Sequence, residues 1–301
     1  MQGSAQDYAA EAAAQSTGGA YGLDAIDEIP DYISHHLEDS RAFEFLGMHL
    51  DLGAFAFEPI HIGGLALDLS PTRQLIFIFL SAILCIALFV PVARSLARRG
   101  SGSAPSGFVN GAEALILYFR DEIVRANIGK DGDGYTPFIL TIFFFILFMN
   151  LLGLTPFGIT ATANLSVTAA LAGIAFIATE VAGWRALGPA GYAKTIFYVP
   201  EGLPGPMKPI ILAIMTPVEF LGKLTKPFAL AVRLFANMMA GHILILAIVG
   251  LILVTQNFVV GGASVLVMSL IMILELFVAC LQAYIFAMLT SVFIGLIRHA
   301  H

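Results

Sequence analysis

The sequence predicts an all-α polytopic membrane protein with five transmembrane helices and one amphipathic helix at the cytoplasmic surface. Hydrophobic residues make up 58% of the 301 residues, charged residues make up only 12%, and the mean hydropathy is +0.87. Apolar runs long enough to cross a hydrocarbon core of about 30 Å recur along the chain. This composition is typical of a membrane protein and excludes an ordinary soluble domain.

Residues 1–72 precede the first apolar run and are predicted to form an extracytoplasmic extension that is partly disordered. Residues 1–22 are rich in Ala, Gly, Ser and Gln and lack the apolar core of a cleavable signal peptide. From Ile26 to Asp68, short alternating runs favour one or two small strands at the membrane surface. Residues 73–301 are predicted to form the membrane domain.

No metal site, disulfide or cofactor is predicted. His35 and His36 are adjacent, but no second group of ligands accompanies them. Cys85 and Cys280 both lie in apolar runs, where a thiol usually behaves as a small hydrophobic side chain. The chemistry is therefore expected to come from the protein's own charged and polar groups.

The first span is expected from about Arg73 to Val92, and its flanking charges predict its orientation. Arg41 is the only basic residue before it, whereas three arginines follow it closely, namely Arg94, Arg98 and Arg99. Positive charge collects on the cytoplasmic side of a membrane protein. The N-terminus is therefore predicted to lie outside the membrane, with residue 100 in the cytoplasm.

The segment from Gly111 to Ile128 is predicted to be an amphipathic helix on the cytoplasmic surface. It mixes apolar residues with Glu122 and Arg125, and it is too polar to cross the membrane. The run Asp131–Gly134 is expected to be a turn that ends this helix, because the further ligand positions of a calcium loop would fall in an apolar run.

Thr136–Pro156 and Asn164–Ala182 are the second and third predicted spans. The loop between them has no charge, which places it outside. A Gly- and Pro-rich segment follows and is predicted to be cytoplasmic, because it carries Arg185, Lys194 and Lys208.

The last two apolar runs, Ile210–Val254 and Ala263–Ile297, are predicted to form a helical hairpin. As helices they would each extend about 50–70 Å, well beyond the hydrocarbon thickness, so they must tilt steeply or bend. Pro217 and Pro227 are candidate bend points in the first of them. Five crossings return Arg298 to the cytoplasm.

The run Pro227–His242 is the most informative stretch, because it places Arg233, Asn237 and His242 inside an apolar helix. An Arg at the centre of a spanning helix costs roughly 2.5–3.5 kcal/mol, so it usually faces protein or water and serves a function. A snorkelling Arg would need a helix end nearby, but mostly apolar residues continue on its C-terminal side.

The hairpin predicts which polar residues share a level. If the chain turns near position 258, antiparallel partners lie at equal distances on either side of it, so Arg233 faces the level of Gln282, and His242 that of Glu275. The nine residues between Arg233 and His242 turn the helix by about half a revolution. One side of the hairpin therefore offers a cation, and the other a titratable His–Glu pair.

The run Arg233-Leu-Phe-Ala-Asn-Met-Met-Ala-Gly-His242 resembles the R-L-x-x-N-x-x-A-G-H/E motif of the a subunits of F-type rotary ATP synthases. The resemblance covers roughly residues 73–298. In that family, a residue at the His242 position is Glu or His, and the one at the Glu275 position tends to be its complement. Further matches are Glu219, Lys226-Pro227, Glu275, Gln282, Met149–Pro156 and Asn164.

The resemblance implies a proton-channel stator subunit that couples proton translocation to ring rotation and ATP synthesis. Two offset half-channels and an essential Arg233 facing the c-ring carboxylates are expected, with no active site of the subunit's own. The implied partners are the c-subunit ring, b-type peripheral stalk subunits, the rest of the ATP synthase and the lipid bilayer. Nucleic acid is not among the implied partners, and the net charge of −6 says little about such binding because it comes largely from the first seventy residues.

The polar residues then receive different expected roles. His242 and Glu275 are candidates for the outer half-channel, since His titrates near neutrality, and Glu219 belongs by resemblance to the inner one. Asn237 and Gln282 are expected to orient Arg233 and water, because amides do not titrate. Three residues could be channel-lining or structural: Asn150, Asn164 and Lys226.

Two other classes of protein would also fit intramembrane charges. A secondary ion-coupled transporter or channel places Arg and Glu at mid-membrane, but such proteins often carry internal repeats and none is visible here. A haem-binding respiratory subunit needs axial ligands, and His242 is the only His inside a predicted span. Co-purification separates the three classes, because the chain would be recovered with a c ring and an ATPase sector, as a free transporter, or in a coloured complex.

Overall fold

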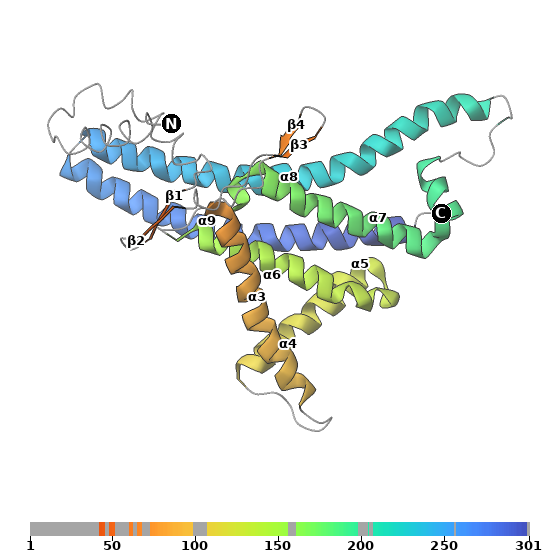
Figure 1. The fold of residues 1–301 in the computed structure, drawn as a ribbon, viewed down its shortest axis with the longest axis horizontal. Helices are drawn as coiled ribbons and strands as arrows, with labels where there is room; N and C mark the ends of the chain where they lie inside the picture. The colour runs from red at the N-terminus through yellow and green to blue at the C-terminus, as the bar shows by residue number, and fades with distance from the viewer. Residues whose placement is uncertain are drawn as a thin grey trace. The chain divides into compact units, whose positions relative to one another are not determined.

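Five long apolar helices dominate the computed structural model, which confirms the predicted polytopic helical fold (Figure 1). The structure describes residues 42–45, 48–51, 60–62, 65–67, 73–98, 107–155, 161–197, 204, 207–255 and 257–299. The predictions for residues 1–22, His35 and His36 lie outside this described part. The helices long enough to span a membrane are α3 (Arg73–Ala97), α6 (Thr136–Gly153), α7 (Leu165–Ile196), α8 (Lys208–Thr255) and α9 (Phe258–Arg298).

The chain divides into two units, and each is described by itself. One unit comprises residues 39–241 and 271–301, and the other contains residues 242–270, which form the tip of the last two helices. Helix α8 ends at Thr255 and α9 begins at Phe258, so the connection lies next to the predicted turn at 258. Asn257 caps α9 by accepting a hydrogen bond from the Val259 amide at 2.9 Å.

Short strands precede the membrane helices, as the alternating runs predict. Strand β1 (Ala42–Phe45) pairs antiparallel with β2 (Met48–Asp51), and β3 (Ile60–Ile62) pairs antiparallel with β4 (Leu65–Leu67). The segment thus forms two hairpins rather than one or two isolated strands. The sequence between β3 and β4 is Gly-Gly, a composition that favours a two-residue hairpin connection.

The predicted amphipathic segment is helical but not uniform. It consists of α4 (Phe108–Tyr118), the π-helix η2 (Phe119–Arg125) and α5 (Ala126–Ile128), followed by the 3-10 helix η3 (Lys130–Tyr135) in place of a simple turn. The carbonyl of Ile123 accepts bonds from the Asn127 amide side chain at 2.7 Å and the Ser291 hydroxyl at 3.1 Å. Wider π-helical spacing leaves such carbonyls open to other donors.

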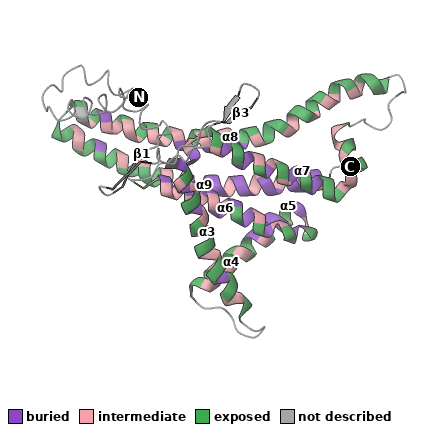
Figure 2. Cartoon of the chain, viewed as in Figure 1, coloured by how far each residue is buried: buried purple, intermediate pink, exposed green. Residues whose placement is uncertain are grey.

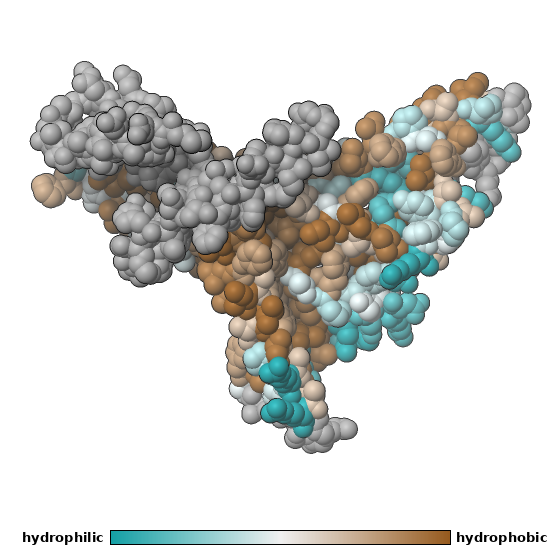
Figure 3. Space-filling model, in the orientation of Figure 1, coloured by the Kyte–Doolittle hydropathy of each residue, from teal (hydrophilic) through white to brown (hydrophobic). Residues whose placement is uncertain are grey.

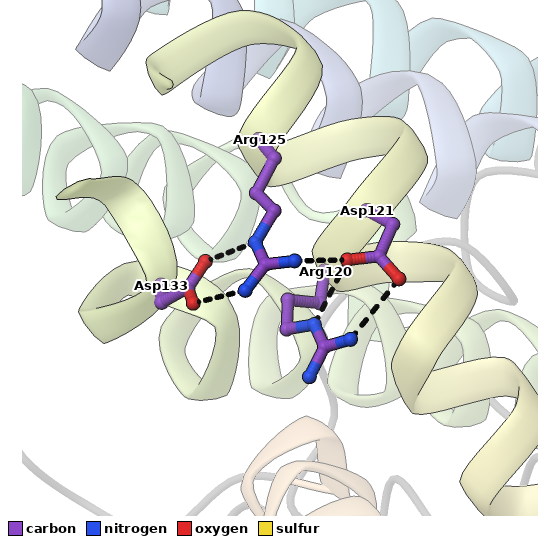
Figure 4. Close-up of polar contacts among 4 residues, drawn as sticks. All are labelled: Arg120, Asp121, Arg125 and Asp133. Atoms are coloured by element: carbon purple, nitrogen blue, oxygen red, sulfur yellow. Dashed lines mark hydrogen bonds and ion pairs between the residues drawn. The ribbon is translucent and has the colours of Figure 1, made fainter. Parts of the chain in front are cut away.

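The polar side of this segment is an ion-pair network on η2 and η3 (Figure 4). Arg125 binds Asp133 through two bonds of 2.7 and 2.6 Å, and its third contact is to Asp121 at 2.9 Å. The Arg120 guanidinium beside Asp121 holds the pKa of that carboxyl below its usual range. The opposite side of the segment buries Phe119, Ile123 and Val124 (Figure 2), so the segment is amphipathic as predicted.

Helix α7 continues well beyond its predicted end at Ala182. Gly188 adopts a left-handed φ of 69° with ψ of 174°, and Pro189 begins a second helical piece that runs to Ile196. Pro is favoured in the first turn of a helix, since its missing N–H would be unpaired there anyway. The first part of the Gly- and Pro-rich stretch is therefore two helical pieces of α7 joined by a sharp kink at Gly188.

Close backbone approaches hold the end of α9 in the larger unit. A β-carbon at Gly183 would lie 2.6 Å from Ile297 Cγ1, and one at Gly295 would overlap the carbonyl of Asn127. Glycine at these two positions lets α9 pack directly on α7 and α5. The buried core around these contacts includes Ile123, Ile139, Ala182, Ala287 and Ile294.

Outward-facing side chains on α3 are large and apolar. Phe79, Ile83 and Ile86 are each about 60% exposed, at 61%, 58% and 61%. Figure 3 shows the hydrophobic surface over α3 and a hydrophilic cluster at its C-terminal end, where Arg94 lies. This distribution suits a helix surrounded by lipid with its basic end in water.

Candidate ion-translocation site

Arg233 lies on α8 with an exposed side chain, and no described residue forms a hydrogen bond or ion pair with it. Its helical neighbours Leu230, Leu234 and Met238 are at most 4% exposed and pack inward. At about 100° per residue, Arg233 projects roughly a third of a turn away from this buried stripe. The guanidinium is therefore directed away from the core of its own unit.

The surface around Arg233 is made of small side chains. Ala229, Ala236 and Ala240 are exposed on the same side of α8. Small side chains let another helix approach closely. This face, defined by Ala229, Arg233, Ala236 and Ala240, is referred to below as the Arg233 face.

Asn237 and Gln282 are brought together as a pair between α8 and α9. The Asn237 amide donates to Gln282 Oε1 at 3.0 Å, and Gln282 is only 3% exposed. Asn237 lies one helical turn after Arg233. The contact fits the predicted role of both amides as hydrogen-bonding groups beside the arginine.

Glu275 lies directly against the backbone of Gly241. A β-carbon built on Gly241 would be 2.6 Å from Glu275 Cδ, so only glycine leaves room for the carboxyl group. Both residues are 17 positions from residue 258, as the hairpin register predicts. Glu275 Oε2 is buried and has no hydrogen-bond partner among the residues that the structure describes, which leaves it to a proton or a water molecule.

His242 belongs to the unit that contains the hairpin tip, whereas Glu275 belongs to the larger unit. The predicted pairing of these two residues therefore stays a prediction.

A cavity of about 220 Å³ opens between α7, α8 and α9, and Glu219 and Lys226 line it as part of the predicted inner route. This volume has room for several water molecules, since one water needs only about 10–15 Å³ of such space. Polar residues from all three helices reach the cavity, including Thr179, Glu180, Thr195, Lys223 and Thr290.

Glu180 is a cavity residue that is absent from the sequence-based predictions. Its Oε2 lies 3.4 Å from Lys223 Nζ, and it also accepts a hydrogen bond from the Tyr192 hydroxyl. The signal was available, because Glu180 is the only charged residue of the third predicted span. An isolated acid in an apolar run is as informative as an isolated arginine.

Asn150 and Asn164 both make structural contacts. Asn150 is fully buried, donates to the Ala279 carbonyl at 3.3 Å and accepts from the Thr162 hydroxyl at 2.7 Å. Asn164 caps α7 by accepting from the Ser166 amide, and it donates to Gln74 at 2.6 Å. These bonds favour the capping and interhelical interpretation, and a channel role stays a prediction.

Within the described residues, no three His, Cys, Asp or Glu side chains come together in a way that could hold a metal ion.

Comparison with known proteins identifies one family. The family model described as ATP synthase A chain matches residues 75–295. The ATP synthase subunit a of Myxococcus xanthus is 46% identical over 270 residues, which cover 85% of this chain and 85% of the relative.

Two further relatives bear the same name. The ATP synthase subunit a of Anaeromyxobacter dehalogenans is 43% identical over 277 residues, covering 88% of this chain and 70% of the relative. The ATP synthase subunit a of Chlorobium phaeobacteroides is 39% identical over 267 residues, which cover 88% of this chain and 74% of the relative.

Proposed function

Because the chain belongs to the family of ATP synthase a subunits, the proton-channel stator subunits of F-type ATP synthases, we propose that its Arg233 faces the ring of c subunits. The family assignment supports the stator function over the transporter alternative. The protein is a multi-pass membrane component of the ATP synthase complex. We further propose that it has no active site of its own.

The observation that carries this proposal is the Arg233 face. An exposed arginine that has no partner among the described residues, on a surface of alanines, suits a second helix that brings a carboxylate close to the guanidinium. A lipid-facing surface would not carry a charge at that position. The face is therefore the best candidate for contact with the ring.

The charge of Arg233 then explains how proton translocation is coupled to rotation of the ring. A ring carboxylate that approaches Arg233 is stabilised in its ionised form, because an opposite charge lies within about 4–6 Å. It can take up a proton only after moving away from the arginine. A guanidinium is not deprotonated in proteins, so it cannot pass a proton on. Protons therefore cannot pass from one route to the other without rotation of the ring.

The two routes are assigned to different parts of the chain. We place the inner half-channel in the cavity between α7, α8 and α9, where Glu219 and Lys226 lie. We place Glu275 and His242 in the outer half-channel. The bond between Asn237 and Gln282 keeps α8 and α9 in contact beside Arg233.

We also propose that residues 1–72 are an extracytoplasmic extension of the membrane domain 73–301, with the C-terminus cytoplasmic and b-type stalk subunits as further partners. Cysteine labelling tests the orientation in a variant whose native cysteines, Cys85 and Cys280, are replaced by Ser. Ser103→Cys should react with an impermeant reagent only from the cytoplasmic side. Labelling from outside alone would reverse the topology and both half-channel assignments.

Disulfide cross-linking tests contact with the ring. In the same cysteine-free background, Ala236→Cys and Ala240→Cys on the Arg233 face should cross-link to cysteines introduced in the c subunit. Ile86→Cys on α3 is the matched control, because it is exposed and apolar but lies on a different helix. Cross-links from Ile86→Cys and none from the two alanine positions would contradict the proposed orientation of α8.

A further inference from the structure

Glu219 and Lys223 are four residues apart on α8, and this spacing normally produces an ion pair on one side of a helix. The structure does not contain that pair. Lys223 Nζ lies 3.4 Å from Glu180 on α7 instead, and no described residue forms a hydrogen bond or ion pair with Glu219.

Three groups on α7 hold the Lys223 ammonium. Besides the Glu180 carboxylate, it donates to Thr195 Oγ1 at 3.1 Å and lies 4.6 Å above the ring of Tyr192. The kink at Gly188 separates Glu180 from Tyr192 and Thr195, which lie on the second helical piece of α7. The Lys223 and Glu180 side chains are only 12% and 19% exposed, so water screens their attraction weakly.

The remaining charged groups of the cavity do not compensate Glu219 either. Lys226, on the same helix, lies 5.5 Å above the ring of Phe293. Helix α9 contributes only uncharged residues to the lining, namely Thr290, Phe293, Leu296 and Ile297. Among the α7 residues that line the cavity, Glu180 is the titratable one, and its carboxylate accepts a hydrogen bond from the Tyr192 hydroxyl. Glu219 is thus a cavity carboxylate whose two nearest lysines in sequence are both engaged elsewhere.

We propose that Glu180 is a positioning residue that holds Lys223 away from Glu219, so that Glu219 remains free to gain and lose a proton in the inner cavity. The inference rests on the proposed inner half-channel. It adds a function for Glu180, Tyr192 and Thr195 as the receptor for a lysine that would otherwise neutralise the proton-carrying carboxylate.

The expected consequence of losing Glu180 follows from the charges. In Glu180→Gln, the attraction between Lys223 and α7 falls, and Lys223 can turn to Glu219 on its own helix. An adjacent ammonium stabilises the ionised carboxylate. Glu219 would then accept protons from the cytoplasm only at lower pH.

The test is ATP-driven proton pumping in inverted membrane vesicles, measured against external pH, because the cytoplasmic side of the membrane faces outward there. For Glu180→Gln we expect the pH of maximal pumping to fall by about one pH unit. The reason is that a neighbouring opposite charge lowers the pKa of a carboxyl group by about 1–3. The double variant Glu180→Gln/Lys223→Gln should return the pH profile to that of the wild type. Rates are expressed per assembled complex.

Two matched controls separate the local effect from a general one. Glu122→Gln removes an exposed acid on η2, and Lys194→Gln removes an exposed base next to Thr195; both should leave the pH profile unchanged. If Glu180→Gln fails to assemble, Glu180→Asp, which retains the charge on a shorter side chain, should show a smaller shift in the same direction.

An unchanged pH profile in assembled Glu180→Gln, or a double variant as impaired as the single one, would overturn the inference. Arg233→Ala measured in parallel distinguishes this failure from a failure of the proposed function. If Arg233→Ala abolishes pumping while Glu180→Gln behaves as wild type, only the role of Glu180 is wrong. If Arg233→Ala pumps normally, the proposed function itself fails.

Discussion

Replacement of Arg233 by Ala should abolish ATP synthesis and ATP-driven proton pumping while the complex still assembles. Assembly should survive, because the Arg233 side chain is exposed and has no partner among the described residues that its loss would leave unpaired. Passive proton flux should persist or rise, because a ring carboxylate could then carry a proton past the stator in either direction without being forced around the ring. ATP synthesis and ATP-driven pumping are measured in membranes that retain the catalytic sector, and passive proton flux is measured in the same membranes after that sector has been stripped off.

Two comparison variants sharpen this result. Arg185→Ala removes an exposed arginine from α7, a different helix from the one that carries the Arg233 face, and it should retain coupled pumping. Arg233→Lys keeps a cation but allows it to lose its proton when desolvated, so partial coupling with a raised leak is expected. Normal ATP synthesis by Arg233→Ala would refute the electrostatic barrier, and lost transport without any proton leak would indicate a substrate-binding arginine instead.

The spans and the register of the last hairpin could be predicted because both depend on simple periodic geometry. Apolar length defines a spanning helix, and two antiparallel helices advance equally on either side of their turn. Gly241 and Glu275 meet at equal distances from residue 258, as this argument requires. The register predicts Arg233 at the level of Gln282, whereas Gln282 bonds Asn237, one turn further along α8.

The kink in α7 and the ion pair of Glu180 could not be predicted in the same way. A Gly-Pro step has the same composition in a loop and in a kinked helix, and only the backbone angles of Gly188 distinguish them. The pair of Glu180 with Lys223 joins residues 43 positions apart. The spacing of four residues on α8 favours an ion pair between Glu219 and Lys223 instead. The contact of Lys223 with Glu180 on α7 therefore overrides the pairing that the helix alone would favour.

Glu275 supplies the second large expected effect, through the glycine that faces it. Gly241→Ala would place a methyl group where the carboxyl now lies, since the β-carbon would be 2.6 Å from Glu275 Cδ. The helix itself should not suffer, because Ala is about 0.5–1 kcal/mol more favourable than Gly in a helix interior. The carboxyl must therefore move away from its position against α8. If Glu275 belongs to the outer half-channel, coupled pumping should fall by at least about tenfold, because small misplacements of a reacting group are costly.

Variants that change the side-chain size at position 241, 222 or 275 test whether the clash with the Glu275 carboxyl group causes the loss of pumping. Gly222→Ala is the matched control, because it makes the same change on α8 where a β-carbon would meet nothing within 4 Å, and it should pump normally. The double variant Gly241→Ala/Glu275→Asp shortens the carboxylic side chain by one methylene, which restores space for the added methyl group, so pumping should recover in part. Glu275→Asp alone should be impaired, because its carboxyl group would withdraw from Gly241. A Gly241→Ala variant that pumps at the rate of the wild type would show that the position of the Glu275 carboxyl group does not limit proton flux, and it would remove Glu275 from the outer half-channel.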